Sequence, residues 1–276
     1  MYRHKLCLGL SHQFGLPYEE QIALLRRIGF EGFFVNWEAD LDFTALRAKA
    51  DELGMIFQSI HAPFVKMADM WEKTDQTQTA VDELLACLRD CARIAVPVMV
   101  VHAFIGFDKH APTALGLETF GRVVAEAEKL GVKLAFENTE GEEYLAALMQ
   151  HFAQSPAVGF CWDTGHELCY NYGKDMLALY GERLLATHLN DNLGIRNYDG
   201  TITWHDDLHL LPFDGIADWK NIAARLKKCG FEELLTFELN THSKPNRCEN
   251  DAYARMEIEE YLTHTYMRAC RVAALM

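Results

Sequence analysis

The feature that most constrains this sequence is an alternation of short apolar segments with amphipathic ones, repeated eight times along 276 residues. Several of the apolar segments are hydrophobic on both faces, which is typical of parallel strands covered by helices. The predicted strands occupy residues 5–11, 32–37, 55–63, 96–104, 132–138, 158–165, 184–191 and 233–240. Eight such βα units in under 300 residues predict a (β/α)8 TIM barrel, with residues 1–276 forming a single α/β domain.

The intervening segments carry the periodicity and the end signals of helices. They cover residues 18–30, 43–55, 79–95, 119–132, 142–154, 174–184 and 216–231, and a last helix is expected from about Asn250 almost to Met276. Glycine follows the apolar pattern in "RRIGF", "DELGM", "EKLGV" and "KKCGF", as expected at helix C-termini. A doubly wound sheet is the competing architecture, but no glycine-rich phosphate loop follows the first strand. We expect the last helix to complete the barrel, although residues 267–276 could also support a homo-oligomer.

Charge and hydropathy limit the classes of partner. The chain has 26 Lys and Arg against 40 Asp and Glu, a formal net charge of −14. Because proteins gain affinity for nucleic acids from basic side chains that neutralise phosphates, this balance argues against nucleic acid and anionic membranes. No apolar run approaches the ~18 residues that span a bilayer, and the first apolar segment is too short for a secretory signal. With eight scattered cysteines, these features predict a cytoplasmic protein with reduced thiols.

The stretch "GFCWDTGHE", residues 159–167, ends an apolar strand in Asp163 and places His166 three residues later. Burying a carboxylate without partners is costly, so such an acid indicates a nearby cation or an open mouth. In a (β/α)8 barrel the C-terminal ends of all strands open on one face. Metal-competent side chains end six consecutive predicted strands: His61, His102, Glu137, Asp163, His188 and Glu238.

Four of these positions predict a divalent-metal site: Glu137, Asp163, His188 and Glu238. Three carboxylates in one mouth repel one another unless a cation offsets them, and the strand ends supply no Lys or Arg. The mixed oxygen and nitrogen set suits Zn²⁺ or Mn²⁺ best, and Mg²⁺ or Co²⁺ also fit. The alternative is a salt-bridged polar rim without metal.

The remaining histidines near the strand ends extend this prediction to one to three ions. His61, His102 and His166 stand beside the carboxylates, and the long segment 190–219 contains Asp207 and His209, which face the same way in an extended chain. The alternative is that these side chains form hydrogen bonds to substrate hydroxyls or to each other. The other histidines have no such placement: His4, His12, His110, His151, His205, His242 and His264.

Weaker candidates for contact with a small polyhydroxylated substrate lie in the predicted loops. Trp37 ends the second predicted strand and Glu38 follows it, and Arg196 lies in the long segment 190–219. An arginine there suits a carboxylate, a phosphate or a sugar hydroxyl, while packing or plain solvation is the alternative for all three.

The segments "SIHAPF", "VVHAF", "FENTEG", "WDTGH", "THLND", "DLHLLPFDG" and "FELN", in this order, resemble the xylose-isomerase-like TIM barrels. That superfamily includes sugar and sugar-phosphate isomerases and epimerases and endonuclease IV. Resemblance to the ketose epimerases implies that Glu137, Asp163, His188 and Glu238 bind the metal. It also implies that Glu137 and Glu238 form the acid/base pair of an enediolate mechanism and that His166 contacts a substrate hydroxyl.

Two departures qualify this resemblance. The epimerases carry an arginine a few residues after the histidine of strand seven, where this chain has "NLG" at 192–194 and Arg196 slightly later. Resemblance to endonuclease IV implies instead nine ligands for three zinc ions: His61, His102, Glu137, Asp163, His166, His188, Asp207, His209 and Glu238. The alternative function is therefore a multi-zinc phosphoesterase, acting on abasic DNA or on a small phosphate ester. Against it, "DLHLLPFDG" replaces that family's basic, histidine-rich arm.

Overall fold

Parallel strands form the centre of the fold in the computed structural model, which describes residues 4–108 and 111–276. The strands are β1 (Leu6–Gly9), β2 (Gly32–Asn36), β3 (Ile56–His61), β4 (Val98–His102), β5 (Lys133–Glu137), β6 (Val158–Asp163), β7 (Leu184–His188) and β8 (Leu235–Phe237). Their order around the sheet is β7-β6-β5-β4-β3-β2-β1-β8, so neighbours in sequence are neighbours in space. The predicted (β/α)8 barrel is confirmed.

The barrel closes between β7 and β8 through a thin seam. Within the described chain these two strands meet in one parallel bridge, between Leu189 and Phe237. The Leu189 amide donates to the Thr236 carbonyl at 2.8 Å, and the Glu238 amide donates to the Leu189 carbonyl at 3.4 Å. The other neighbours are joined by ladders of three to five paired residues, with a shift of register in β2–β3 and in β6–β7.

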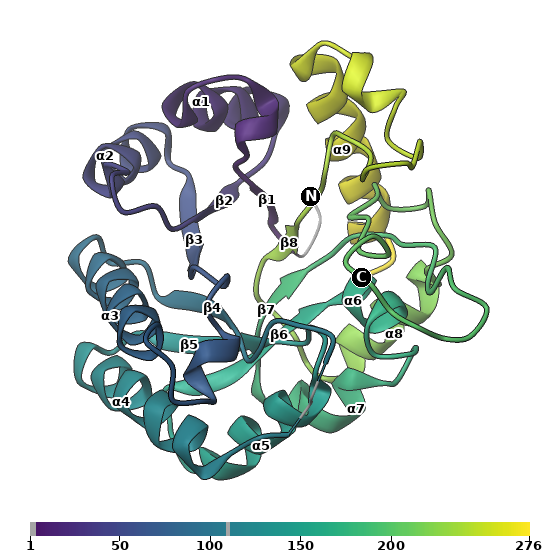
Figure 1. The fold of residues 1–276 in the computed structure, drawn as a ribbon. Coiled ribbons are helices and arrows are strands. Elements are labelled where there is room, and N and C mark those ends of the chain that lie inside the picture. The colour runs from purple at the N-terminus through teal and green to yellow at the C-terminus, as the bar shows by residue number, and fades with distance from the viewer. Residues whose placement is uncertain (1–3, 109–110) are drawn as a thin grey trace.

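Helices surround the strands as an outer ring (Figure 1). They are α1 (Tyr18–Ile28), α2 (Phe43–Leu53), α3 (Thr77–Arg93), α4 (Ala114–Leu130), α5 (Glu142–His151), α6 (Thr164–Cys169), α7 (Met176–Tyr180), α8 (Trp219–Lys228) and α9 (Ile258–Ala273). Four 3-10 turns join them: η1 (His12–Phe14), η2 (Ala68–Met70), η3 (Gly181–Arg183) and η4 (Tyr253–Arg255). Among the described residues, no helix is both long and apolar enough to cross a membrane.

Four helical segments differ most from the sequence prediction. Helix α4 begins at Ala114, five residues before the expected start at 119. The helix expected at 174–184 is the short α7 followed by η3, and the last helix begins at Ile258 rather than near Asn250. Helix α6 was not predicted, because its six residues begin with Thr164 and Gly165, which indicated only a turn. Helix α9 packs beside α1, where the rings of Phe30 and Tyr266 lie 5.2 Å apart, so it completes the barrel as expected.

The inward faces of the middle strands build the floor of the site. Small and medium apolar side chains form a cluster of their own there: Val98, Val100, Ala135, Cys161 and Ala186. Residues two apart on a strand point the same way, so the residue two positions after each of the last four also faces inward. Those positions are the strand-terminal residues His102, Glu137, Asp163 and His188.

Candidate metal centre

The strand-terminal residues converge at the C-terminal mouth of the barrel. His61, His102, Glu137, Asp163 and His188 are the last residues of β3, β4, β5, β6 and β7, and Glu238 directly follows β8. Strand register places His102 beside Glu137 and Asp163 beside His188. Parallel pairing thus brings together side chains that lie far apart in the sequence.

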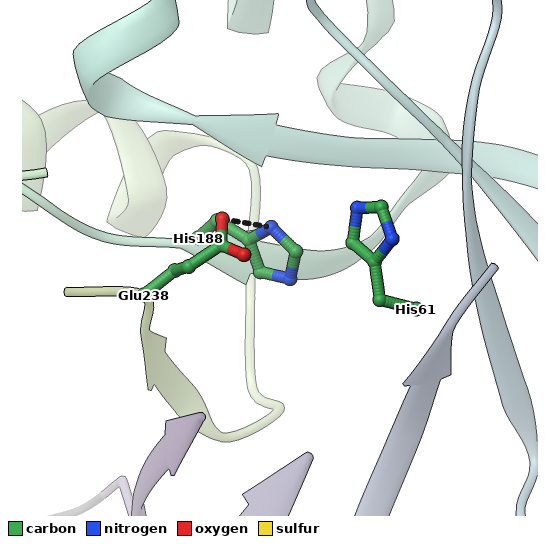
Figure 2. A group of neighbouring side chains, drawn as sticks. All are labelled: His61, His188 and Glu238. Atoms are coloured by element: carbon green, nitrogen blue, oxygen red, sulfur yellow. Dashed lines mark ion pairs between the residues drawn. The ribbon is translucent and has the colours of Figure 1, made fainter. Parts of the chain in front are cut away.

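Glu137, Asp163, His188 and Glu238 form a compact group whose ligand atoms all lie within 4.8 Å of one another. His188 Nδ1 lies 3.0 Å from Glu137 Oε1 and 3.1 Å from Glu238 Oε2. Figure 2 shows the imidazole of His188 beside the Glu238 carboxylate, with His61 on its other side. Adjacent ligands of an ion with bonds of about 2.1 Å lie roughly 3 Å apart, so the donor set fits a divalent cation.

The charges of this group are strongly coupled. Burial by itself raises the pKa of Glu137, but His188, His102 and His61 outweigh it and hold that pKa well below its usual range. Burial also opposes ionisation of Glu238, yet His188 lowers its pKa to about 2. These residues therefore stay ionised around neutral pH.

The imidazole of His188 supplies the compensating charge in the protein alone. Burial lowers its pKa, but Glu238 and Glu137 raise it well above the usual value. Asp163 is the exception, because burial raises its pKa to about 6 despite the nearby His166. A bound divalent cation would take over the role of the proton on His188.

Two further groups of metal-competent side chains adjoin the first. His61 Nε2 and His102 Nε2 each lie 3.3 Å from Glu137 Oε2, so Glu137 belongs to both groups. Among the described residues, the buried His102 Nδ1 has no hydrogen-bond partner, and burial lowers the pKa of this histidine.

The third group is His166, Asp207 and His209. Asp207 Oδ1 lies 2.9 Å from His209 Nε2 and 3.3 Å from His166 Nε2. His209 has a backbone φ of 49°, in the left-handed region, so the expected extended arm bends at this residue. Even so, Asp207 and His209 both reach the mouth, as the sequence predicted.

Asp163 is held in place by polar contacts that sequence reasoning missed. Its Oδ1 accepts a hydrogen bond from the His166 amide at 2.6 Å and so caps α6, while its Oδ2 accepts from Asn190 Nδ2 at 2.8 Å. Its own amide donates to Asn138 Oδ1 at 2.8 Å. Asn190 lies two residues after His188, so in extended chain its side chain points the same way as that predicted ligand, and this spacing would have found it.

A cavity of about 490 Å³ opens above the group. Its wall includes His61, His102, His166, Asp207, His209 and Glu238, together with Asn36, Phe64, Ile105, Gly106, Phe107, Glu140, Tyr170, Trp204 and Lys244. Glu137, Asp163 and His188 are fully buried beneath it. Sequence analysis missed Lys244 and Trp204, which the loops after β8 and β7 bring to the mouth.

Trp37, Glu38 and Arg196 do not line this cavity. Trp37 Nε1 donates to Asp90 of α3 at 2.9 Å, and Glu38 accepts from Tyr18 at 2.9 Å and pairs with His12. Arg196 is exposed on the long loop after β7. Of the histidines without a predicted role, His110 lies outside the described residues, and the others are not part of the cavity wall.

Comparison with known proteins places this barrel in a family. The model of the xylose isomerase-like TIM barrels matches residues 22–263, and the chain belongs to that family. The uncharacterized protein y4fM of Sinorhizobium fredii is 27% identical over 78% of this chain and 78% of its own length.

Solved structures share the fold at low sequence identity. An IOLI protein with a bound zinc atom superimposes with a TM-score of 0.76 at 16% identity, over 98% of both chains. An L-ribulose 3-epimerase gives a TM-score of 0.73 at 16% identity, over 98% of this chain and 95% of its own. The fold of this chain is thus shared by a protein with a bound zinc atom and by an L-ribulose 3-epimerase.

Proposed function

We propose that this protein is a divalent-metal-dependent isomerase or epimerase of a small polyhydroxylated substrate. The observation that carries the proposal is the arrangement of Glu137 and Glu238 on either side of His188 Nδ1, at 3.0 and 3.1 Å. Two ionised carboxylates at one cation site can both hold the ion and transfer a proton. The zinc-bound IOLI protein and the L-ribulose 3-epimerase of the same fold support the proposal.

The two glutamates differ in access to the substrate. The Glu238 side chain is 24% exposed and lines the cavity, whereas Glu137 is fully buried. Glu238 is therefore the carboxylate placed to accept a proton from the carbon next to a substrate carbonyl, and Glu137 is the second carboxylate of the pair. When bound, the ion supplies positive charge that stabilises the negative charge developing on the substrate oxygen.

The cavity suits a small molecule better than a nucleic acid. Its volume of about 490 Å³ falls within the ~300–1,000 Å³ of small-molecule sites. Among its described lining residues, Lys244 is the single lysine or arginine. A phosphodiester backbone is bound by several basic side chains, and the chain carries a net charge of −14.

The test combines metal content with proton exchange. Elemental analysis of protein purified without chelator should give about one equivalent of Zn or Mn, and NMR in D₂O should detect deuterium entering a ketose of a test panel. Glu238→Gln and Glu137→Gln should abolish exchange, while the surface variant Glu259→Gln should not. Exchange that persists after complete metal removal would refute the proposal.

A second candidate, a multi-zinc phosphoesterase, is favoured by the other two residue groups. His61 and His102 share Glu137 with the first group, and His166, Asp207 and His209 form a third. This candidate requires two or three equivalents of zinc and hydrolysis of a phosphate ester, measured on an abasic duplex and on small phosphomonoesters. Asp207→Ala or His209→Ala should then be nearly as damaging as Glu137→Gln. If both variants kept metal content and activity, the phosphoesterase candidate would be excluded.

A further inference from the structure

Lys244 stands out among the residues that line the cavity because no part of the proposed chemistry uses it. It lies in the loop that follows β8, and its side chain is 21% exposed. Within the described chain, its Nζ makes no hydrogen bond, and its nearest acidic partner is Asp207 Oδ2 at 3.5 Å. An ammonium group has three donors, so this lysine retains its full capacity to bind an acceptor.

Asp207 does not account for the position of Lys244. The other carboxylate oxygen of Asp207 faces two imidazoles, His209 Nε2 at 2.9 Å and His166 Nε2 at 3.3 Å. A single carboxylate is therefore already supplied with two nitrogen partners. Lys244 adds a positive charge beside it, and the 3.5 Å between Lys244 Nζ and Asp207 Oδ2 is longer than an ordinary hydrogen bond.

The loop that carries Lys244 is fixed on both sides of the lysine. Asn250 Nδ2 donates to the Asn240 carbonyl at 3.0 Å, and the Asn250 amide donates to Ser243 Oγ at 2.9 Å. Arg247 donates to the His205 carbonyl at 3.2 Å, which ties this loop to the long loop after β7. A loop held in this way presents its lysine to the cavity at a defined place.

Trp204 supplies an apolar surface next to the charge. Lys244 Nζ lies 5.4 Å from the centre of the Trp204 ring, and the tryptophan is 49% exposed at the cavity. A cation over an indole face is attracted by it, which keeps the ammonium at the mouth rather than in bulk water.

We infer that Lys244 binds an anionic group, a carboxylate or a phosphate, at the end of the substrate away from Glu238. This inference rests on the proposed function and narrows its substrate to acidic sugars or sugar phosphates. A single lysine matches a single anionic group. The polyhydroxylated remainder of the substrate then extends from Lys244 toward Glu238, across a cavity whose wall includes both residues.

Isothermal titration calorimetry on zinc-loaded protein at fixed ionic strength tests this directly. The probes are D-fructose, D-fructose 6-phosphate and 5-keto-D-gluconate, which share a ketose chain and differ in charge. Lys244→Met keeps the length of the side chain and removes the charge, and Lys244→Arg keeps the charge. Wild type should bind at least one anion about tenfold more tightly than D-fructose, since charge-assisted hydrogen bonds contribute on this scale. Lys244→Met should lose that preference and Lys244→Arg should keep it.

The two anions distinguish the chemical source of the charge. If Lys244→Met loses the preference for D-fructose 6-phosphate alone, the group bound by Lys244 is a phosphate. If the variant loses the preference for 5-keto-D-gluconate alone, that group is a carboxylate. Equal binding of all three probes, no binding of either anion, or a preference that survives Lys244→Met would overturn the inference. Anion selectivity through Lys244 without deuterium exchange in any ketose would instead refute the isomerase function and leave the anion site standing.

Discussion

The carboxylate of Glu167 and the guanidinium of Arg225 form a bidentate pair, with N–O distances of 2.6 and 2.9 Å. Glu167 Oε2 also accepts a hydrogen bond from Trp162 Nε1 at 2.9 Å, and the Arg225 guanidinium lies 4.7 Å from the centre of the Trp162 ring. The pair thus joins β6, α6 and α8 behind the metal centre. Asp163 and His166 lie on the segment that it fixes.

Glu167→Gln should destabilise the protein by on the order of 3 kcal/mol, because it removes the charge of the buried pair and leaves Arg225 only its ion pair with Asp175, whose side chain is 54% exposed. The side chains of Glu167 and Arg225 are only 8% and 15% exposed. Urea unfolding of the metal-free protein measures the change. The matched control is Glu259→Gln, whose pair with Arg27 is 63% exposed on both sides and should contribute below about 1 kcal/mol. Equal losses in the two variants would contradict a structural role for the buried pair.

Gly165→Ala should weaken metal binding at the four-residue group. A Cβ at residue 165 would lie 1.9 Å from Asn190 Oδ1, so the Asn190 amide would have to move away from Asp163. We expect a ten- to hundredfold loss of zinc affinity, as for other removals of groups that orient a metal ligand. Competition titration with a chelator measures it. Gly121→Ala is the control, since its Cβ would meet only Phe152 Cζ at 3.9 Å and should leave zinc affinity unchanged.

Asp191→Asn should loosen the long loop after β7. The Asp191 carboxylate accepts hydrogen bonds from the amides of Asn192, Phe213 and Ala217 and from Trp219 Nε1, all within 3.0 Å. An amide side chain cannot accept on both sides, so two of these bonds are lost. Hydrogen exchange of the 192–218 segment should become faster.

Asp199→Asn is the control for the same loop, because Asp199 accepts from the Thr201 amide at an exposed turn. It should leave the exchange of the segment unchanged. If Asp191→Asn behaved in the same way, the loop would owe its order to other contacts.

Zinc affinity should rise with pH. In the metal-free protein the pKa of His188 lies well above its usual value, so His188 carries a proton that zinc must displace. One displaced proton makes the association constant rise about tenfold per pH unit across neutral pH. Burial raises the pKa of Asp163 to about 6, so a second proton is released below that pH and the slope steepens there. Chelator competition between pH 5 and 8 measures the zinc association constant. A constant that does not change with pH would show that zinc binds without His188.

The sequence was sufficient for the fold and for the residues that converge. The opening of all strand ends on one face locates His61, His102, Glu137, Asp163, His188 and Glu238 without any structure. Period-two spacing adds Asp207 and His209. Segments that are hydrophobic on both faces predicted the parallel sheet, and four glycines predicted the C-terminal ends of helices. Those signals are local in the sequence. Because consecutive strands are neighbours in a barrel, residues at the ends of consecutive strands lie close together in space.

Two cavity residues that the sequence analysis did not predict, Lys244 and Trp204, lie in loops. Lys244 and Trp204 come to the cavity through hydrogen bonds such as that from Arg247 to the His205 carbonyl, which no periodicity encodes. Trp37 and Glu38 lie at a strand end, as predicted, but bind Asp90 and Tyr18 instead of facing the cavity. The position of a residue at the end of a strand therefore predicts where its side chain points. The position of a loop residue beyond that end does not.

The candidate metal centre lies across the seam between β7 and β8. His188 ends one strand of that seam and Glu238 follows the other, and their side chains lie 3.1 Å apart. Local opening starts where a fold has the fewest hydrogen bonds, and a single bridge closes this barrel at that place. A divalent cation bound at the candidate centre would join the two strands across this seam. Loss of the ion would then favour local opening of the barrel there, and an opened barrel is more accessible to proteases.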